Sequence, residues 1–249
     1  MGNLKNLLVY INPAKAFSEE YNILAKIQLH NSFHLGWKKE DIIFVTNFPW
    51  ERHGVKAIVV GDEHYCAVRP RSIKTAIIPY LIEAGIIEKG KIYWNHDFDA
   101  YQLNVIKQGE LGLANFDVGL TDYGWKDRWC MGSFFVKASS KDIFEKAKEI
   151  IYKDIEDETA MVELTQNKAV AKRCKRLNIT YNFGMRNVGF NYKIAKKPLK
   201  VAHFHTKYPY RDYSLSDTPL NCFMYGKNEL NMPLMPERLI KIFHHYGIK

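Results

Sequence analysis

The run Leu7–Asn12 constrains the fold more than any other part of the sequence, because it is a nearly continuous apolar stretch that Pro13 stops. Strands that are buried on both faces read as continuous apolar runs, whereas half-exposed strands alternate between apolar and polar residues. The sequence then predicts a helix over Glu19–Asn31 and a second strand over Ile42–Val45. The chain therefore begins in the strand–helix–strand pattern of an α/β protein.

The same alternation continues along the chain. A helix is predicted over Ser72–Ala84. Pro79 is expected to kink this helix or to shift its start, and Gly85 is expected to end it. No linker rich in glycine, serine or proline divides the chain, so we expect one α/β domain over 1–211, with a mixed Rossmann-like sheet flanked by helices, and a C-terminal extension over 212–249 that packs on it. The predicted strands are Ala57–Val60, Ile92–Trp94, Asn115–Gly119, Ser133–Lys137 and Val201–His205, and the predicted helices are Ser72–Ala84, Ser139–Ile151 and Ala160–Arg176.

Composition excludes several classes of protein. The 249 residues, 47% of them apolar, are enough to bury a substantial core. No apolar stretch is long enough to span a bilayer and the first residues do not resemble a secretory signal, so we expect a soluble, cytoplasmic protein. The 4 cysteines are dispersed without a Cys-x-x-Cys pair, which argues against a zinc or redox centre built from cysteine pairs.

The net charge of +9 is unevenly distributed. Residues 165–211 contain 12 lysines and arginines and no aspartate or glutamate, interleaved with aromatic residues such as Tyr181 and Phe183. A basic aromatic segment of this kind can follow a phosphate backbone while its rings stack on bases. It is also typical of a solvated basic face whose aromatic residues belong to the core. A non-catalytic nucleic-acid-binding protein that uses residues 165–211 is therefore one reading of the chain.

Two carboxylates one residue apart, Asp97 and Asp99, follow the predicted strand Ile92–Trp94. Residues i and i+2 of an extended segment point the same way, so both side chains can offer oxygens to one hard cation such as Mg2+ or Mn2+. Ligands of open α/β sheets gather at the carboxyl ends of the strands. The position of the pair therefore favours a metal site over a solvated turn.

The order of the motifs along the chain resembles that of nucleotide-sugar glycosyltransferases of the GT-A fold, and the glycogenin-like group is the nearest pattern. The resemblance covers roughly residues 7–210 in motif order rather than in extended identity. It implies a hexosyltransferase that moves a sugar from a nucleotide-diphosphate sugar, a UDP-sugar above all, to an acceptor hydroxyl. The motifs are the first strand, Arg71 and Lys74, Asp97-Phe98-Asp99, Gly132–Phe135, Asp157–Met161 and His203–Pro209.

The resemblance also implies roles around the metal. Asp97 and Asp99 would hold Mn2+ or Mg2+ together with a histidine of the late motif, which is shorter here than in the family. His203 and His205 would point the same way on a strand, and the choice between them stays open. Cleavage of the bond between sugar and phosphate leaves a charged diphosphate, which a metal and basic side chains stabilise. Lys207, Arg71 and Lys74 are the candidates for that contact with the leaving group.

The remaining candidates lie on the donor and acceptor sides. Tyr10 and Asn12 would contact the base and ribose, and Asp62 would either join them or end its strand in a turn. Gly132 would allow the backbone to approach the sugar closely, or would serve only in a turn. Of Asp157 and Glu158, one would act as the general base on the acceptor, although both also suit the acidic N-terminus of a helix.

The acceptor is the least constrained partner. The basic segment suits a hydroxymethylated base in DNA, which the enzyme could flip into its site, as in virus- or phage-type enzymes. A glycan, a lipid-linked sugar or a protein explains the transferase motifs equally well.

Overall fold

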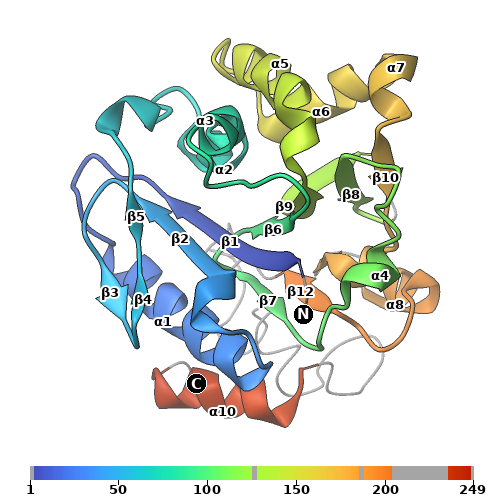
Figure 1. Ribbon diagram of the computed structural model, residues 1–249. Helices are drawn as coiled ribbons and strands as arrows, with labels where there is room; N and C mark the ends of the chain where they lie inside the picture. Colours follow the sequence, from blue (N-terminus) through green and yellow to red (C-terminus); the bar gives the residue numbers. More distant parts are fainter. Residues whose placement is uncertain (1–2, 125–127, 185–187, 204–234, 248–249) are drawn as a thin grey trace, which may run out of the picture.

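A seven-stranded mixed sheet forms the centre of the computed structural model, which describes residues 3–124, 128–184, 188–203 and 235–247 (Figure 1). The strands follow the order β10-β8-β9-β6-β1-β2-β5. The four strands β6, β1, β2 and β5 run parallel, while β9 is antiparallel to both β6 and β8. This confirms the predicted mixed α/β sheet. The strands are β1 (Leu4–Tyr10), β2 (Ile42–Thr46), β5 (Ile58–Val59), β6 (Ile92–His96), β8 (Val118–Asp122), β9 (Trp129–Val136) and β10 (Cys174–Arg176).

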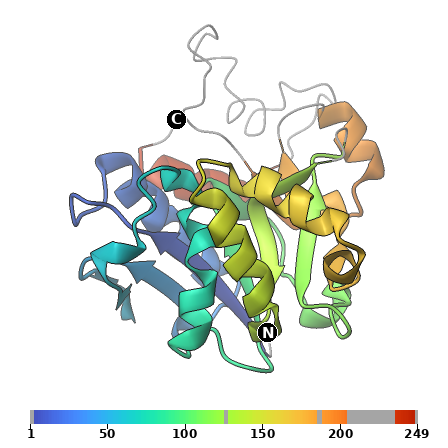
Figure 2. The ribbon, with the colours of Figure 1, turned by 90° about the horizontal axis from the view of Figure 1, so that it is seen from above.

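Helices cover both faces of this sheet. One face carries α2 (Ile73–Ala76), α3 (Ile78–Glu83), α5 (Lys141–Ile151) and α6 (Asp157–Gln166), which Figure 2 shows in front of the strands. The opposite face carries α1 (Glu19–His34), against which α10 (Glu237–His245) lies. Three shorter helices complete the described part of the chain: α4 (Gln108–Leu111), α7 (Lys168–Ala171) and α8 (Val188–Ile194).

The first strand shows why the run that begins at Leu7 is nearly continuously apolar. Leu4 and Leu8 belong to the core on the side of α1, whereas Leu7 and Val9 belong to the core under α2, α3 and α5. All four side chains are at most 6% exposed. Since successive side chains of a strand point to opposite faces, only a strand covered on both sides needs an apolar residue at every position.

A second, three-stranded sheet joins the first at the Asp97-Phe98-Asp99 segment. It consists of β7 (Ala100–Gln102), β12 (Val201–His203) and β11 (Phe183–Gly184), with β12 in the middle, antiparallel to β7 and parallel to β11. The register places His203 opposite Ala100. The chain thus leaves β6, passes through the two aspartates and enters β7, beside the strand that carries the histidine. A separate hairpin pairs β3 (Glu51–Arg52) with β4 (Val55–Lys56).

Two of the predicted helices differ from the observed ones. The helix expected over 72–84 is divided into α2 and α3 around Ile77, two residues before Pro79, and Gly85 follows with φ +71°. The single helix expected over Ala160–Arg176 is wrong. Asn167 stops α6 and caps α7 by accepting a hydrogen bond from the amide of Ala169, and Cys174–Arg176 pairs with β8 as a strand.

Among the residues that the structure describes, no helix is both long enough and apolar enough to cross a membrane. The predicted boundary between 1–211 and 212–249 falls within residues 204–234, outside the described residues, so this division stays a prediction.

Candidate metal centre and pocket

The junction between the two sheets brings Asp97, Asp99 and His203 together. Nε2 of His203 lies 3.2 Å from a carboxylate oxygen of Asp99 and 3.6 Å from one of Asp97. One potential ligand atom of each residue lies within 4.8 Å of those of the other two. Among the described residues, no other three histidine, cysteine, aspartate or glutamate side chains come together in this way. Two carboxylate oxygens and an imidazole nitrogen are donors that suit a divalent cation. These three residues can therefore hold a metal.

The electrostatics of the cluster favour added positive charge. Burial raises the pKa of Asp97 and the neighbouring Asp99 raises it further, while Lys74 and His203 oppose both effects. Burial alone would lower the pKa of His203, but the Asp99 carboxylate raises it well above its ordinary value. A histidine that holds a proton beside two carboxylates marks a place where a cation is stabilised.

Gly132 has a role in this centre that concerns His203. A Cβ atom on Gly132 would lie 2.0 Å from Cε1 and 2.3 Å from Nδ1 of His203, so the imidazole ring occupies the space that any larger residue would fill. The carbonyl of Gly132 also accepts a hydrogen bond from the amide of Asp97 at 2.9 Å. Behind the ring, Sγ of the buried Cys130 lies 3.9 Å from Nδ1. Gly132 thus touches two of the three candidate ligands.

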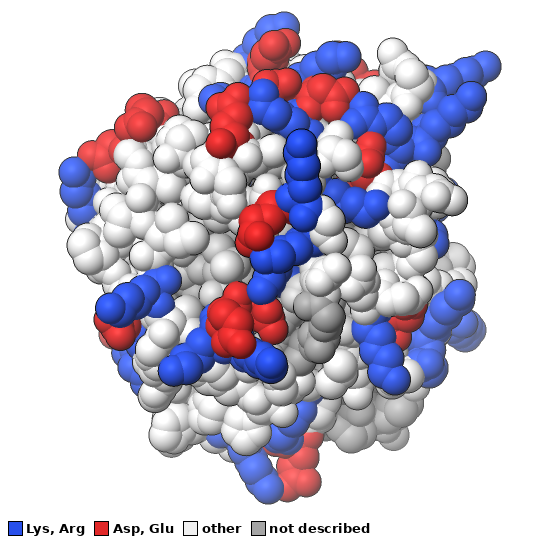
Figure 3. Space-filling view, viewed as in Figure 1, with Lys and Arg blue, Asp and Glu red and all other residues white. Residues whose placement is uncertain are grey.

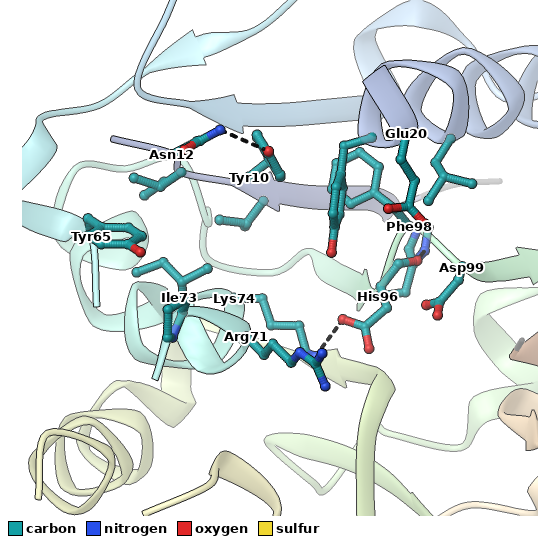
Figure 4. Close-up of a pocket in the computed structure, with 16 residues that line it drawn as sticks. Tyr10, Asn12, Glu20, Tyr65, Arg71, Ile73, Lys74, His96, Phe98 and Asp99 are labelled. Atoms are coloured by element: carbon teal, nitrogen blue, oxygen red, sulfur yellow. Dashed lines mark hydrogen bonds and ion pairs between the residues drawn. The ribbon is translucent and has the colours of Figure 1, made fainter. Parts of the chain in front are cut away.

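Lys74 points from α2 toward the metal centre. Its Nζ lies 2.5 Å from Oδ1 of Asp97, and its side chain is only 9% exposed (Figure 4). Burial by itself lowers the pKa of Lys74, but the carboxylates of Asp97 and Asp157 raise it above its ordinary value. The lysine is therefore a permanently charged, fixed neighbour of the carboxylate pair.

A pocket of about 460 Å3 opens along the carboxyl ends of β1 and β6. Its wall includes Asp97 as well as Asp99, Tyr10, Asn12, Arg71 and Lys74. Figure 4 shows Asp99 on the opposite side of the pocket from Asn12. Pockets of this size and placement are usual for small ligands of α/β proteins. Six residues predicted from the sequence therefore line one cavity.

Asn12 and Asp62 are connected at the far end of this pocket. The side chain of Asn47 donates to the carbonyl of Asn12 at 2.9 Å and to Oδ1 of Asp62 at 2.8 Å. Asp62 also pairs with Lys15 at 2.7 Å, and the hydrogen bond from Lys15 lowers the pKa of its carboxyl. Asp62 is half exposed and lies outside the pocket lining. Its observed contacts tie together the loops that follow β1, β2 and β5.

Asp157 and Glu158, at the start of α6, lie in different surroundings and neither lines the pocket. Asp157 is buried, accepts a hydrogen bond from the hydroxyl of Thr75 at 2.8 Å, and its amide donates to Ser72, so it fastens α6 to α2. Glu158 accepts a hydrogen bond from Tyr123 at 2.5 Å and lies 3.3 Å from Nε of Arg128. Burial raises the pKa of Glu158, which suits proton transfer better than an exposed carboxylate does.

Several pocket residues escaped the sequence analysis. Glu20 and Tyr21 lie in the first turn of α1 and line the pocket beside Asp99, and burial together with Asp97 and Asp99 raises the pKa of Tyr21 to about 12. An acid in the first turn of a helix is usually explained by the helix dipole, so Glu20 gave no separate signal. His96 is buried between Asn6 and the Asp97 carbonyl, and burial lowers its pKa to about 3. Its place directly before Asp97 was the available clue.

Three cations of the basic segment pair with acids from elsewhere in the chain. Arg173 forms ion pairs with Asp117 and Asp142, Arg176 pairs with Asp122, and Lys200 pairs with Glu110. Figure 3 shows blue and red side chains side by side over the visible face. The acid-free stretch of sequence therefore does not form an acid-free surface over these residues. His205 and Lys207 lie outside the described residues.

Comparison with solved structures identifies the fold. The chain is similar to the galactosyltransferase LgtC, solved in complex with donor and acceptor sugar analogues, with a TM-score of 0.59 and 14% identity over 97% of this chain and 95% of that one. It is similar to the glycosyltransferase GlyE of Streptococcus pneumoniae, with a TM-score of 0.59 and 14% identity over 99% of this chain and 65% of that one. A glycosyltransferase involved in glycosylation of the major capsid of the virus PBCV-1 matches with a TM-score of 0.52 and 12% identity, over 80% of this chain and 92% of that one.

No protein-family model and no curated protein sequence matches the chain. The fold is nevertheless clear: a mixed sheet flanked by helices, shared with GT-A proteins over most of the chain. The GT-A fold expected from the order of the motifs is confirmed.

Proposed function

We propose that this protein is a metal-dependent glycosyltransferase that takes a sugar from a nucleotide-diphosphate sugar, a UDP-sugar in the first instance, and transfers it to an acceptor hydroxyl. The observation that carries the proposal is the cluster of Asp97, Asp99 and His203, which opens into the pocket at the strand ends of a GT-A fold. The similar solved structures, among them the galactosyltransferase LgtC in complex with donor and acceptor sugar analogues, support the same class of reaction.

Each part of the pocket has a proposed task. Asp97, Asp99 and His203 hold Mn2+ or Mg2+, with His205 as the alternative histidine. The bound ion stabilises charge that develops on the diphosphate leaving group. Lys74 fixes the carboxylate of Asp97 in place, and Arg71 and Lys207 are the proposed cationic contacts to the phosphates.

The donor nucleotide is proposed to lie along the wall from Asp99 to Asn12. Tyr10 packs against Phe17 and Tyr21 with ring centroids 4.8 and 4.6 Å away, which gives the pocket a rigid aromatic side. Asn12, held by Asn47, is the proposed polar contact to the ribose or base, with Asp62 as a support for that loop. An aromatic wall with one fixed amide is a common way to orient a nucleoside.

On the acceptor side, the two carboxylates at the start of α6 have different contacts, and we propose different roles for them. Asp157 is proposed to position α2, and thereby Lys74, because its carboxylate is occupied by Thr75. Glu158 is the proposed general base if the reaction inverts configuration, because burial raises its pKa.

A glycan or a protein is our first proposal for the acceptor, and a hydroxymethylated base in DNA is the second. The ion pairs of Arg173, Arg176 and Lys200 support this order, because phosphate binding depends on cations that are available to the phosphates. The same pairs weigh against a purely nucleic-acid-binding protein. We propose that the protein acts in the cytoplasm, in keeping with the sequence expectation.

The first test is a thermal-shift series with UDP-, GDP-, TDP- and CDP-sugars, each with Mn2+ and with EDTA. A ligand that binds only the native state stabilises it by RT ln(1 + L/Kd), where L is the free ligand concentration, and the melting temperature rises accordingly. We expect a rise with one nucleotide sugar only when metal is present. Equal responses with metal and with EDTA would contradict the metal site, and a response to DNA alone would favour the binding protein.

A further inference from the structure

Two large apolar side chains lie exposed next to each other on α8. Phe190 and Ile194 are 51% and 43% exposed, and because they are four residues apart they lie on the same face of the helix. In the described part of the chain, no other helix carries two large apolar residues that are this exposed. Single exposed apolar residues are normal on a protein surface, whereas adjacent ones indicate a contact surface. The outer face of α8 is therefore a candidate interface.

Two exposed lysines flank this apolar pair. Lys193 lies three residues after Phe190 on α8, and Lys196 follows the end of the helix. Neither lysine forms an ion pair with any residue that the structure describes, whereas Arg173 and Lys200 of the same basic segment are paired with acids. The positive charge beside α8 therefore remains available to a partner.

The contacts at the end of α8 hold this surface in place. Asn178 accepts a hydrogen bond from the amide of Lys196 at 2.8 Å and donates one to the carbonyl of Ile194 at 3.1 Å. Nζ of Lys197 donates to the carbonyl of Tyr192 at 2.5 Å and lies 3.6 Å from the centroid of its ring. Because the helix and the turn after it are fixed, a partner that binds here has little backbone to order.

The helix α8 stands at the edge of the molecule in both ribbon views (Figure 1 and Figure 2). It follows β11, in which Gly184 pairs with His203 of β12. The ring of Tyr192 packs at a right angle to that of Phe183 in β11, with the centroids 6.5 Å apart. A partner bound to the outer face of α8 would therefore lie beside the sheet that carries His203.

The combination of side chains favours a lipid bilayer over a nucleic acid as the partner. Helices that lie in a membrane interface place apolar side chains at the boundary between headgroups and acyl chains, while their lysines contact anionic headgroups. Phe190 and Ile194 beside Lys193 match this combination. A nucleic acid would leave the aliphatic side chain of Ile194 without a partner, because phosphates attract cations and bases stack on rings.

We propose that Phe190, Lys193, Ile194 and Lys196 form a docking surface for an anionic lipid bilayer. The two apolar side chains enter the interface and the two lysines contact the headgroups, which gives weak, reversible binding through one short helix. The inference is independent of the proposed transferase activity, because none of the four residues lines the pocket.

Co-sedimentation with vesicles tests this surface in the intact chain. One kind of vesicle contains equal amounts of phosphatidylcholine and phosphatidylglycerol, and the other contains phosphatidylcholine alone. The apolar variant combines Phe190→Gln with Ile194→Gln, and the lysine variant combines Lys193→Gln with Lys196→Gln. All four side chains are exposed and glutamine is a good helix former, so both variants should keep the fold, which circular dichroism checks.

Matched controls come from other parts of the surface. The apolar control combines Val59→Gln with Val68→Gln, which removes side chains that are 52% and 49% exposed. The lysine control combines Lys146→Gln with Lys153→Gln, which removes two exposed lysines on and after α5. Neither control should change vesicle binding.

We expect the unchanged protein to bind the anionic vesicles and not phosphatidylcholine alone, and the binding to weaken as salt is added. The lysine variant should bind about 25-fold more weakly, because each basic residue near an anionic surface contributes about 5-fold. The apolar variant should bind at least about 10-fold more weakly, because its side chains no longer gain from leaving water.

Three vesicle results would overturn the proposal: no binding to the anionic vesicles, equal binding to both kinds, or binding that the controls reduce as strongly as the variants do. Two other results would overturn it in favour of another partner. Tight binding of DNA that only the lysine variant reduces would indicate a nucleic acid. A dimer in analytical ultracentrifugation that the apolar variant dissociates would indicate a second copy of the chain.

Discussion

Two lysine–carboxylate pairs of nearly equal burial differ in what surrounds them. Lys74 and Asp97 are 9% and 29% exposed, and Lys200 and Glu110 are 13% and 29% exposed. Lys200 also donates to the carbonyl of Val105 at 2.7 Å, so its pair is a complete structural link between β12 and the loop before α4. Asp97 instead lies beside a second carboxylate, Asp99, and Nε2 of His203 is close to both of them. The second carboxylate and the imidazole, rather than the buried lysine–carboxylate pair, distinguish the candidate metal centre.

Removal of both carboxylates should have the largest effect. In Asp97→Asn combined with Asp99→Asn, metal-dependent sugar transfer should fall by at least about 100- to 1000-fold, the order seen when one group that stabilises developing charge is lost. The thermal midpoint should also fall, because the buried Lys74 loses the carboxylate that pairs with it. Turnover with Mn2+ and the melting curve are the measurements. The control is Asp142→Asn, which removes the acid that pairs with Arg173 and should retain activity. Retained activity in the double variant would exclude this metal site.

The two lysines allow a direct comparison. Lys74→Met should reduce the free energy of unfolding by about 2–3 kcal/mol, somewhat less than the loss of a fully buried partner, because Asp97 is partly exposed. Lys200→Met should cost a similar amount. Chemical denaturation should show that Mn2+ restores stability to Lys74→Met and not to Lys200→Met, because only the first leaves a carboxylate pair that binds metal. Equal restoration in both variants would mean that the two regions do not differ as described.

Gly132→Ala should affect the metal centre without removing a ligand. The new Cβ would require the His203 ring to move, so we expect a loss of Mn2+ affinity of about 10- to 100-fold, comparable with loss of an outer-shell partner. Titration calorimetry measures the affinity. The matched control is Gly184→Ala, since a Cβ there meets nothing within 4 Å. If both variants bind Mn2+ as the unchanged protein does, His203 is not a ligand.

The smallest effect is expected for Arg176, an exposed cation of the basic segment 165–211. Arg176 pairs with Asp122, but its side chain is 56% exposed, so Arg176→Gln should change the free energy of unfolding by less than about 1 kcal/mol. Sugar transfer should be unchanged. Fluorescence polarisation with DNA at several salt concentrations should give the same weak signal before and after the substitution. A salt dependence reduced by about one unit would instead identify a phosphate contact.

Local patterns predicted the fold and several of the residues that the structure brings together. The apolar run of β1, the helix at Glu19 and the aspartate pair after β6 each depend on a few neighbouring residues, and such patterns are visible in one sequence. The choice between His203 and His205 depends on the pairing of β12 with β7, which joins distant segments. No local pattern contains that information.

The basic segment shows that a sequence pattern does not reveal the tertiary neighbours of a charged side chain. Its 12 cations lie within one segment of the sequence, residues 165–211. The acids that pair with Lys200 and Arg173, Glu110 and Asp117, lie well before this segment in the sequence. Gly132 is similar, because its contact with His203 requires β9 and β12 to lie together. Charge and space at a site depend on tertiary neighbours, whereas a sequence pattern reports only the chain's own neighbours.

The position of His203 in β12 has a consequence for biosynthesis. A ribosome releases the chain from its N-terminus, so both aspartates emerge long before the histidine that completes their cluster. Strand pairings between distant segments form late, because the loop between them must close first. If the candidate centre binds metal as proposed, metal binding would depend on completion of the fold, and a chain that ends before β12 would lack the imidazole of His203.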